Sequence, residues 1–153
     1  AHMSVDELDT LFNKRSGMMG LTGFGDLREV HRLVKEGNED AKLALDIYVH
    51  RIVGYIGNYT AQMGGVDVIT FTAGVGENDD VVRKMVCDKL APFGVKLDEE
   101  KNATRSKEPR IISTPDSAVT ICVIPTNEEL AIARKSAAIA EEGKDSYGNV
   151  FSK

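Results

Sequence analysis

The chain has 153 residues, of which 42% are hydrophobic and 28% are charged, and its net charge is −5. This composition suits one globular domain large enough to bury a core, and the acidic balance argues against a nucleic-acid partner, because binding to a phosphate backbone relies on clustered Lys and Arg. No apolar run approaches the roughly 20 residues that a membrane helix needs, and no signal-peptide pattern is present, so we expect no membrane partner and a cytoplasmic location.

The first part of the chain is predicted to be helical. Residues 1–3, Ala-His-Met, have the sequence of a tag remnant and are left out of any functional argument. Apolar residues at helical spacing predict a short amphipathic helix over residues 5–12. Residues 17–25 are so rich in glycine that we expect no regular element there. Asp26 then offers the N-cap of a helix that runs to about residue 35.

A long helix and a strand are predicted next. Residues 39–63 place apolar side chains along one helical face, and two glycines end the helix, which we expect to pack along a sheet. Residues 66–73 are a nearly continuous apolar and β-branched run, which predicts a strand covered on both faces. Residues 74–78 are predicted to form a tight glycine turn. The last residue of this turn, or Asp79 after it, would cap a helix that Gly94 helps to end.

The remaining elements are short strands and a final helix. A short extended piece at residues 95–97 leads to a polar loop over residues 98–109, which we expect to be the most mobile segment. Strands are predicted at residues 111–112 and 119–124, and a helix follows residues 125–129. Strands alternating with helices indicate an α/β domain. Because no strand precedes the long helix, we expect the sheet to lack strands that belong to a longer parent chain.

The cysteines and histidines predict no metal site or disulfide. Cys87 and Cys122 are far apart in apolar surroundings, without the spacing of a disulfide framework or a zinc site, and are predicted to be reduced core thiols. His31 and His50 have no second ligand at metal spacing and are interpreted as surface or packing residues.

Three segments carry possible chemistry, and each allows two interpretations. The glycines of residues 72–78 would let the main chain approach a ligand, yet a tight turn with a helix cap explains the same pattern. Glu128 and Glu129 begin a helix, where they either offset its macrodipole or help to hold Mg²⁺ through water. Residues 26–28, Asp-Leu-Arg, suit a flat base and a ribose, or are a capping aspartate followed by a solvated arginine.

Four segments, read together, carry a family resemblance. They are residues 16–21 (Ser-Gly-Met-Met-Gly-Leu) with 26–28, residues 55–57 (Tyr-Ile-Gly) with 63–65 (Met-Gly-Gly), residues 71–78 (Phe-Thr-Ala-Gly-Val-Gly-Glu-Asn), and residues 123–130 (Val-Ile-Pro-Thr-Asn-Glu-Glu-Leu). In this order and spacing, from about residue 16 to 135, the chain resembles the acetate kinases. These belong to the superfamily of sugar kinases, heat-shock ATPases and actin. The resemblance implies an α/β, ribonuclease-H-like domain truncated at its N-terminal side.

The resemblance also implies roles for particular residues. The residues implied to line an adenosine pocket are Asp26, Leu27 and Arg28. The residues implied to form the loop on which ATP or ADP lies are Gly74, Val75, Gly76, Glu77 and Asn78. Glu128 matches the glutamate of the family's magnesium site, which would hold Mg²⁺ or Mn²⁺.

The implied partners follow from which half of the enzyme is present. The family's N-terminal domain binds acetate and supplies the catalytic groups, and no motif of that domain occurs here. We therefore expect residues 4–143 to be the C-terminal nucleotide-binding and homodimer-forming domain, residues 144–153 to be a flexible tail, and the fragment to be inactive. Acetate and acetyl phosphate would bind only to the full-length enzyme. A propionate or butyrate kinase fragment and a stand-alone nucleotide-binding or interaction module remain the alternatives.

Overall fold

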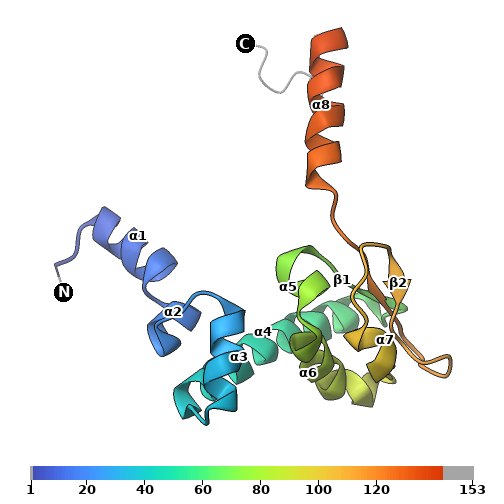
Figure 1. The fold of residues 1–153 in the computed structure, drawn as a ribbon, viewed down its shortest axis with the longest axis horizontal. Helices are drawn as coiled ribbons and strands as arrows, with labels where there is room; N and C mark the ends of the chain where they lie inside the picture. Colours follow the sequence, from blue (N-terminus) through green and yellow to red (C-terminus); the bar gives the residue numbers. More distant parts are fainter. Residues whose placement is uncertain (1, 143–153) are drawn as a thin grey trace.

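The chain has a helical arm, a small α/β body and a projecting last helix (Figure 1). The computed structural model describes residues 2–142, so the predicted tail at residues 144–153 lies outside the described residues. The arm consists of α1 (Val5–Lys14), α2 (Gly17–Thr22), α3 (Leu27–Lys35) and the long α4 (Glu39–Met63). The body consists of β1 (Val68–Phe71), α5 (Ala73–Asn78), α6 (Asp80–Leu90), the 3-10 turn η1 (Ala91–Phe93), α7 (Glu99–Ala103), β2 (Arg110–Ile111) and β3 (Thr120–Val123). The last helix is α8 (Glu128–Glu142), which points away from the body.

Within the described residues, the sheet has three strands in the order β1-β3-β2. β1 is parallel to β3, with Val68 opposite Thr120 and Phe71 opposite Val123, and β2 is antiparallel to β3. This arrangement confirms the predicted α/β class and the predicted strands near residues 68–71 and 120–123. A parallel pair needs a long crossover, which here contains α5, α6 and α7.

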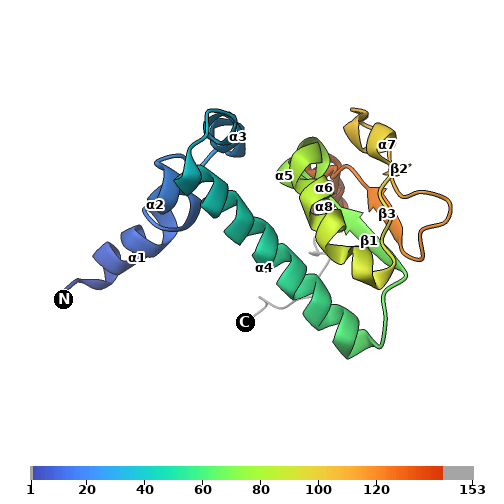
Figure 2. The same cartoon turned by 90° about the horizontal axis from the view of Figure 1, so that it is seen from below.

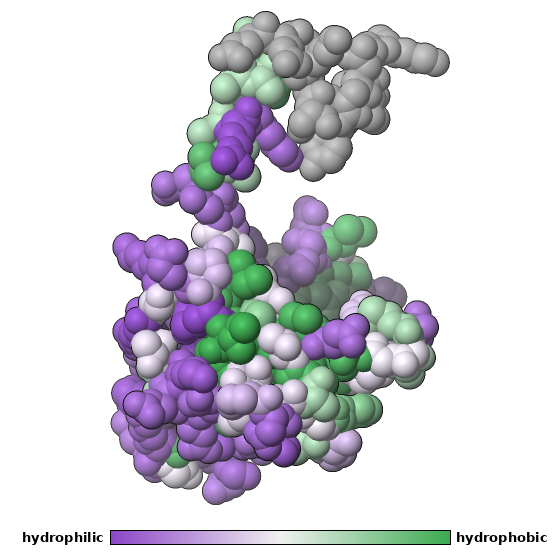
Figure 3. Space-filling view, turned by 90° about the vertical axis from the view of Figure 1, so that its right-hand side faces the viewer, coloured by the Kyte–Doolittle hydropathy of each residue, from purple (hydrophilic) through white to green (hydrophobic). Residues whose placement is uncertain are grey.

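The prediction that β1 is covered on both faces is wrong. Val68 is 52% exposed and Ile111 of β2 is 57% exposed, whereas Ile121 of the central strand β3 is fully buried. The space-filling view shows hydrophobic residues gathered on the face of the body below α8 (Figure 3). The exposed residues Val68 and Thr70 alternate with the more buried Ile69 and Phe71, so within residues 2–142 one face of β1 packs on the core and the other is not covered.

The core lies where α4, α6 and the sheet meet. Its largest fully buried side chains are Val30, Val49, Val86, Leu90, Ile112, Ile121 and Val123. Each such aliphatic side chain contributes roughly 1.5–3 kcal/mol by leaving water. α4 packs against α2, α3 and α6 (Figure 2), and its Leu45 and Val49 belong to the same core cluster as Phe71 of β1.

Two segments predicted to be irregular contain helices. Residues 17–22 form α2, because Gly17 and Gly23 adopt positive φ at its two ends (60° and 77°) and bound the helix without interrupting it. Residues 99–103 form α7 within the expected mobile loop. The side chain of Asp98 accepts a hydrogen bond from the Lys101 amide as an N-cap.

Candidate functional site

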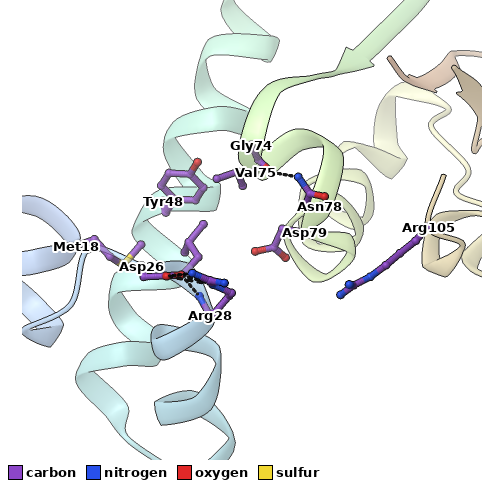
Figure 4. A pocket seen from close by; sticks show the side chains of 11 residues that line it. Met18, Asp26, Arg28, Tyr48, Gly74, Val75, Asn78, Asp79 and Arg105 are labelled. Atoms are coloured by element: carbon purple, nitrogen blue, oxygen red, sulfur yellow. Dashed lines mark hydrogen bonds and ion pairs between the residues drawn. The ribbon is translucent and has the colours of Figure 1, made fainter. Parts of the chain in front are cut away.

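A cavity of about 790 Å³ opens between the arm and the body. It is lined by Met18, Gly25, Asp26, Leu27, Arg28, Tyr48, Gly74, Val75, Asn78, Asp79 and Arg105. The cavity thus brings together the start of α3 and the helix α5, which are about fifty residues apart in sequence and face each other in space (Figure 4). Six residues predicted for nucleotide binding lie here, and Gly76, Glu77 and Glu128 lie elsewhere.

The α3 wall is organised by Asp26. This residue is the N-cap of α3, and its Oδ1 accepts a hydrogen bond of 2.9 Å from the Arg28 amide. Its Oδ2 accepts a second bond of 2.6 Å from Nη2 of Arg28. The guanidinium lowers the pKa of Asp26 to about 2. Capping and cavity lining are therefore compatible at this position, because one carboxylate starts the helix and holds Arg28 at the cavity edge.

The α5 wall is a short helix, so the predicted tight glycine turn at residues 74–78 is wrong. The positive φ at the start of this helix belongs to Ala73 (58°), and neither Gly74 nor Gly76 needs a left-handed conformation. A Cβ on Gly74 would meet nothing within 4 Å. A Cβ on Gly76 would lie 3.1 Å from the carbonyl carbon of Phe71. Gly74 faces open space in the cavity, while Gly76 allows α5 to pack closely on the end of β1.

Asp79 and His31 tie the two walls together. Nε2 of His31 in α3 lies 2.7 Å from Oδ2 of Asp79, and these side chains are 18% and 13% exposed. Oδ1 of Asp79 accepts a hydrogen bond of 2.9 Å from the Val82 amide, which makes Asp79 the N-cap of α6 as predicted. The interpretation of His31 as a packing residue missed this bridge. This pairing could not be predicted from the amino-acid sequence, because the two residues are 48 positions apart.

Two further cavity residues were not predicted. Tyr48 projects from α4 into the cavity (Figure 4), and partial burial, with a smaller effect of the Asp79 charge, raises the pKa of its phenol. Arg105 reaches the cavity from the segment after α7, opposite Arg28 (Figure 4). Helical periodicity places Tyr48 on the inner face of α4, but only the fold brings Arg105 near.

Behind α5, a buried arginine holds the helix in place. Arg83 of α6 is 2% exposed, and its Nη1 donates hydrogen bonds of 3.0 Å to the carbonyl oxygens of Gly76 and of Glu77. Its Nε and Nη2 donate to the side chain and the carbonyl of Asn102 in α7, each at 2.7 Å. Burial, and then the positive charge of Arg110, lower the pKa of Arg83. Arg83 therefore satisfies the last carbonyls of α5 and joins α5 to α7.

A second, more open cavity of about 480 Å³ adjoins the first at Gly74. It is lined by Ala73, Gly74, Glu77, Thr126, Asn127, Glu128 and Glu129. Oε1 of Glu77 accepts hydrogen bonds from the amide and the hydroxyl of Thr126, at 2.8 and 3.0 Å. These bonds, the amide bond first, lower the pKa of Glu77. The structure thus places Glu128, which is exposed, in a groove next to Gly74 and away from the apolar wall of the first cavity.

The donor atoms of this groove suit Mg²⁺ in one particular way. No group of three or more His, Cys, Asp or Glu side chains within residues 2–142 is arranged to hold a metal ion by itself. Mg²⁺, however, usually keeps several waters and is held by one or two carboxylates together with substrate phosphates. Glu128 and Glu129 therefore fit a metal that arrives with a phosphorylated ligand.

In the described part of the chain, no helix has the length and apolarity that crossing a membrane requires.

Comparison with known proteins identifies relatives over nearly the whole chain. A family model described as the acetokinase family matches residues 1–134. The acetate kinase of Leifsonia xyli is 54% identical over 136 residues, which are 89% of this chain and 34% of that protein. The acetate kinase of Desulfotalea psychrophila is 53% identical over 137 residues, which are 90% of this chain and 34% of that protein. The chain spans about a third of the length of the curated relatives it matches.

Solved structures show the same relation. The crystal structure of Porphyromonas gingivalis acetate kinase is similar with a TM-score of 0.81 and 41% identity, covering 91% of this chain and 35% of that one. A propionate kinase from Francisella tularensis is similar with a TM-score of 0.77 and 39% identity, covering 86% of this chain and 33% of that one. The arrangement of arm and body therefore occurs in kinases of two different short-chain acids.

Proposed function

Because the chain belongs to the acetokinase family, we propose that it is the nucleotide-binding part of an acetate kinase. The parent enzyme would transfer the γ-phosphoryl group of ATP to acetate reversibly, giving acetyl phosphate and ADP. We assign residues 4–143 to the C-terminal nucleotide-binding and dimerisation domain, and this range includes residue 143, which lies outside the described residues. The observation that carries the proposal is the cavity that joins residues 26–28 to α5 and continues at Gly74 into the groove of Glu128.

The base and the ribose of the nucleotide would lie in the first cavity, and the phosphates would extend towards the groove of Glu128. Leu27, Tyr48 and Val75 give the first cavity an apolar lining suited to an adenine ring, and the Asp26–Arg28 ion pair at its edge suits the ribose. The phosphates would pass Gly74, where the main chain leaves open space. Glu128 would hold Mg²⁺ through water in the groove. When bound, the cation offsets the charge that spreads over the phosphate oxygens during transfer.

The test of this proposal is calorimetric titration of the chain with ADP and ATP in the presence of Mg²⁺. We expect saturable binding, and Gly74→Val should weaken binding because a branched side chain would enter the open space of the cavity. Glu100→Ala changes an exposed carboxylate on α7 and serves as the control. A chain that folds and binds neither nucleotide contradicts the proposal.

The chain alone should show no acetate kinase turnover above blank. Phosphoryl transfer depends on aligned reactants and on cations around the γ-phosphate, and the described cavities offer a place for the nucleotide and one acidic groove. A coupled assay with ATP, acetate and Mg²⁺ measures this. Turnover close to that of a full-length acetate kinase would contradict the assignment of this chain to the nucleotide half.

A parent enzyme specific for propionate is the second candidate. The structural similarity to a propionate kinase favours keeping it, since the shared part has a TM-score of 0.77. Butyrate is a third possible acid, because the residues that would select the acid are not among those that line the two cavities. Comparing kcat/KM for acetate, propionate and butyrate in the full-length parent decides among the three.

We further propose a homodimer formed through α4. Three large side chains near the end of this helix are spaced by four residues and are exposed; this α4 stripe consists of Tyr55, Tyr59 and Met63. The Tyr55 and Tyr59 rings stack with centroids 6.3 Å apart, and Arg51 lies over the Tyr55 ring. An ordered apolar stripe of this kind is typical of an interface between two copies of a chain.

A further inference from the structure

The start of α8 is attached to the body by a short series of hydrogen bonds. The amide of Ile124 donates to the carbonyl of Phe71 at 2.9 Å, and the hydroxyl of Thr72 donates to the carbonyl of Ile124 at 2.8 Å. Thr126 then donates twice to Glu77. Beyond this point α8 points away from the body (Figure 1). The position of Glu128, the first residue of α8, therefore depends strongly on the attachment of Thr126.

The side chain of Glu77 makes the hydrogen bonds that attach Thr126 to the body. A single oxygen, Oε1, accepts both bonds from Thr126, at 2.8 and 3.0 Å, across 49 positions of sequence. Charge-assisted bonds to an ionised carboxylate are about twice as strong as neutral ones. Glu77 also belongs to the same short helix as Gly74, and both line the groove of Glu128. Its carboxylate therefore connects the nucleotide wall directly to the acidic segment.

We infer that Glu77 is a positioning residue, which fixes Glu128 at a set place relative to Gly74 and does not itself contact the nucleotide. This inference rests on the proposed function. It changes the expectation from the family resemblance, in which Glu77 is one of the residues on which the nucleotide lies. The role predicted for Glu77 is to hold the Glu128 carboxylate where Mg²⁺ can bind both to it and to the phosphates that pass Gly74.

The experiment compares four variants of the whole chain. Glu77→Ala removes the acceptor, Glu77→Gln keeps an oxygen acceptor without the charge, Thr126→Val removes the hydroxyl and keeps the amide, and Glu100→Ala is the control. Amide exchange of Thr126 is measured by NMR without ligand. ADP affinity is measured by calorimetry with and without Mg²⁺, and the ratio of the two affinities gives the contribution of the metal.

Glu77→Ala should speed the exchange of the Thr126 amide, leave the affinity for metal-free ADP within about twofold, and reduce the Mg²⁺ contribution on the order of tenfold, as is usual for residues that orient metal ligands. Glu77→Gln should restore part of both properties, because its amide oxygen still accepts from Thr126 but carries no charge. Thr126→Val should have a smaller effect than Glu77→Ala, because one of the two hydrogen bonds remains.

Three results would overturn the inference. An equal loss of ADP affinity with and without Mg²⁺ in Glu77→Ala would make Glu77 a nucleotide contact. Unchanged exchange of the Thr126 amide in that variant would mean that no attachment was lost. A normal Mg²⁺ contribution despite faster exchange would mean that the attachment does not position the metal carboxylate. If the unmodified chain bound no ADP at all, the proposed function itself would be overturned, which distinguishes the two failures.

Discussion

The two glycines of α5, Gly74 and Gly76, are two residues apart, and their surroundings in the structure differ. Gly76 lies against the end of β1, where a Cβ would approach the Phe71 carbonyl carbon to 3.1 Å. Gly74 has open space around it and an ordinary φ. The sequence pattern presents the two as equivalent. Their substitutions should therefore affect two separate properties, nucleotide affinity and stability.

Gly74→Ala should weaken ADP binding while the free energy of unfolding stays unchanged or rises by up to about 1 kcal/mol, because alanine costs less entropy in a helix than glycine. Gly76→Ala should lower that free energy by about 1–3 kcal/mol through overpacking against β1. Urea unfolding and calorimetry measure both, and Gly54→Ala on α4, where a Cβ meets nothing, is the matched control. Loss of stability in Gly74→Ala with unchanged ADP affinity would make Gly74 only a structural residue.

Cys87 is predicted to resist alkylation at pH 8. Burial raises the pKa of its thiol to about 12, so the reactive thiolate is scarce in the folded chain. In the unfolded chain the Cys87 thiol has its ordinary pKa of 9.0. The stabilisation of the folded chain by the protonated thiol is therefore complete below pH 9 and is lost as the pH rises towards 12. Mass spectrometry after iodoacetamide treatment, with and without guanidinium, measures the labelling. Equally fast labelling of Cys87 in the folded chain would contradict this prediction.

At the scale of elements, the cavity depends on how α3 is held against α6. The pair of His31 and Asp79 crosses between them with both side chains largely buried, and Asp79 also begins α6. A single carboxylate therefore caps one helix and fixes the position of another. This arrangement sets the distance between the wall of residues 26–28 and the wall of α5.

His31→Ala and Asp79→Asn should show a coupling energy within about 0.5–3 kcal/mol in a double-mutant cycle of unfolding free energies. Asp79→Asn is chosen because an amide oxygen still accepts from the Val82 amide, so the helix cap survives. Asp79→Ala should cost about 1 kcal/mol more through loss of the cap. Additive effects of His31→Ala and Asp79→Asn would show that the contact contributes nothing to stability.

The elements that could be predicted are those whose apolar residues follow a clear helical or strand pattern. The 25-residue helix α4 and the strand β3 were found from apolar spacing alone. The short helices α2, α5 and α7 were missed because their sequences are glycine-rich or polar. Tertiary contacts accompany two of them: Gly76 packs on Phe71, and Asn102 of α7 bonds to Arg83. Local sequence does not show contacts of this kind.

At the scale of the molecule, the chain spans about a third of the length of its curated relatives. Many of its large hydrophobic side chains are exposed in the described fold. The family resemblance located the segments that meet in the cavity. It gave no indication of Arg83 or Arg105, whose places depend on the packing of α7.

Tyr59→Glu should convert the proposed homodimer to a monomer at micromolar concentration, because it places a charge in the middle of the α4 stripe. Light scattering coupled to gel filtration measures the mass. Ala61→Glu adds the same charge at an exposed position of α4 outside the stripe and should leave the dimer intact. A monomeric unmodified chain, or a Tyr59→Glu dimer, would contradict the proposal.

Arg83 has a consequence for how the binding cavity behaves as a whole. Its guanidinium bonds to the end of α5 and to α7, and the segment that follows α7 carries Arg105 into the cavity from the opposite side. Two surfaces of the cavity that are distant in sequence are therefore fastened to one buried side chain. They form a single rigid unit, and the His31–Asp79 contact also ties α3 to it, so a change in the width of the cavity is expected to require breaking that contact.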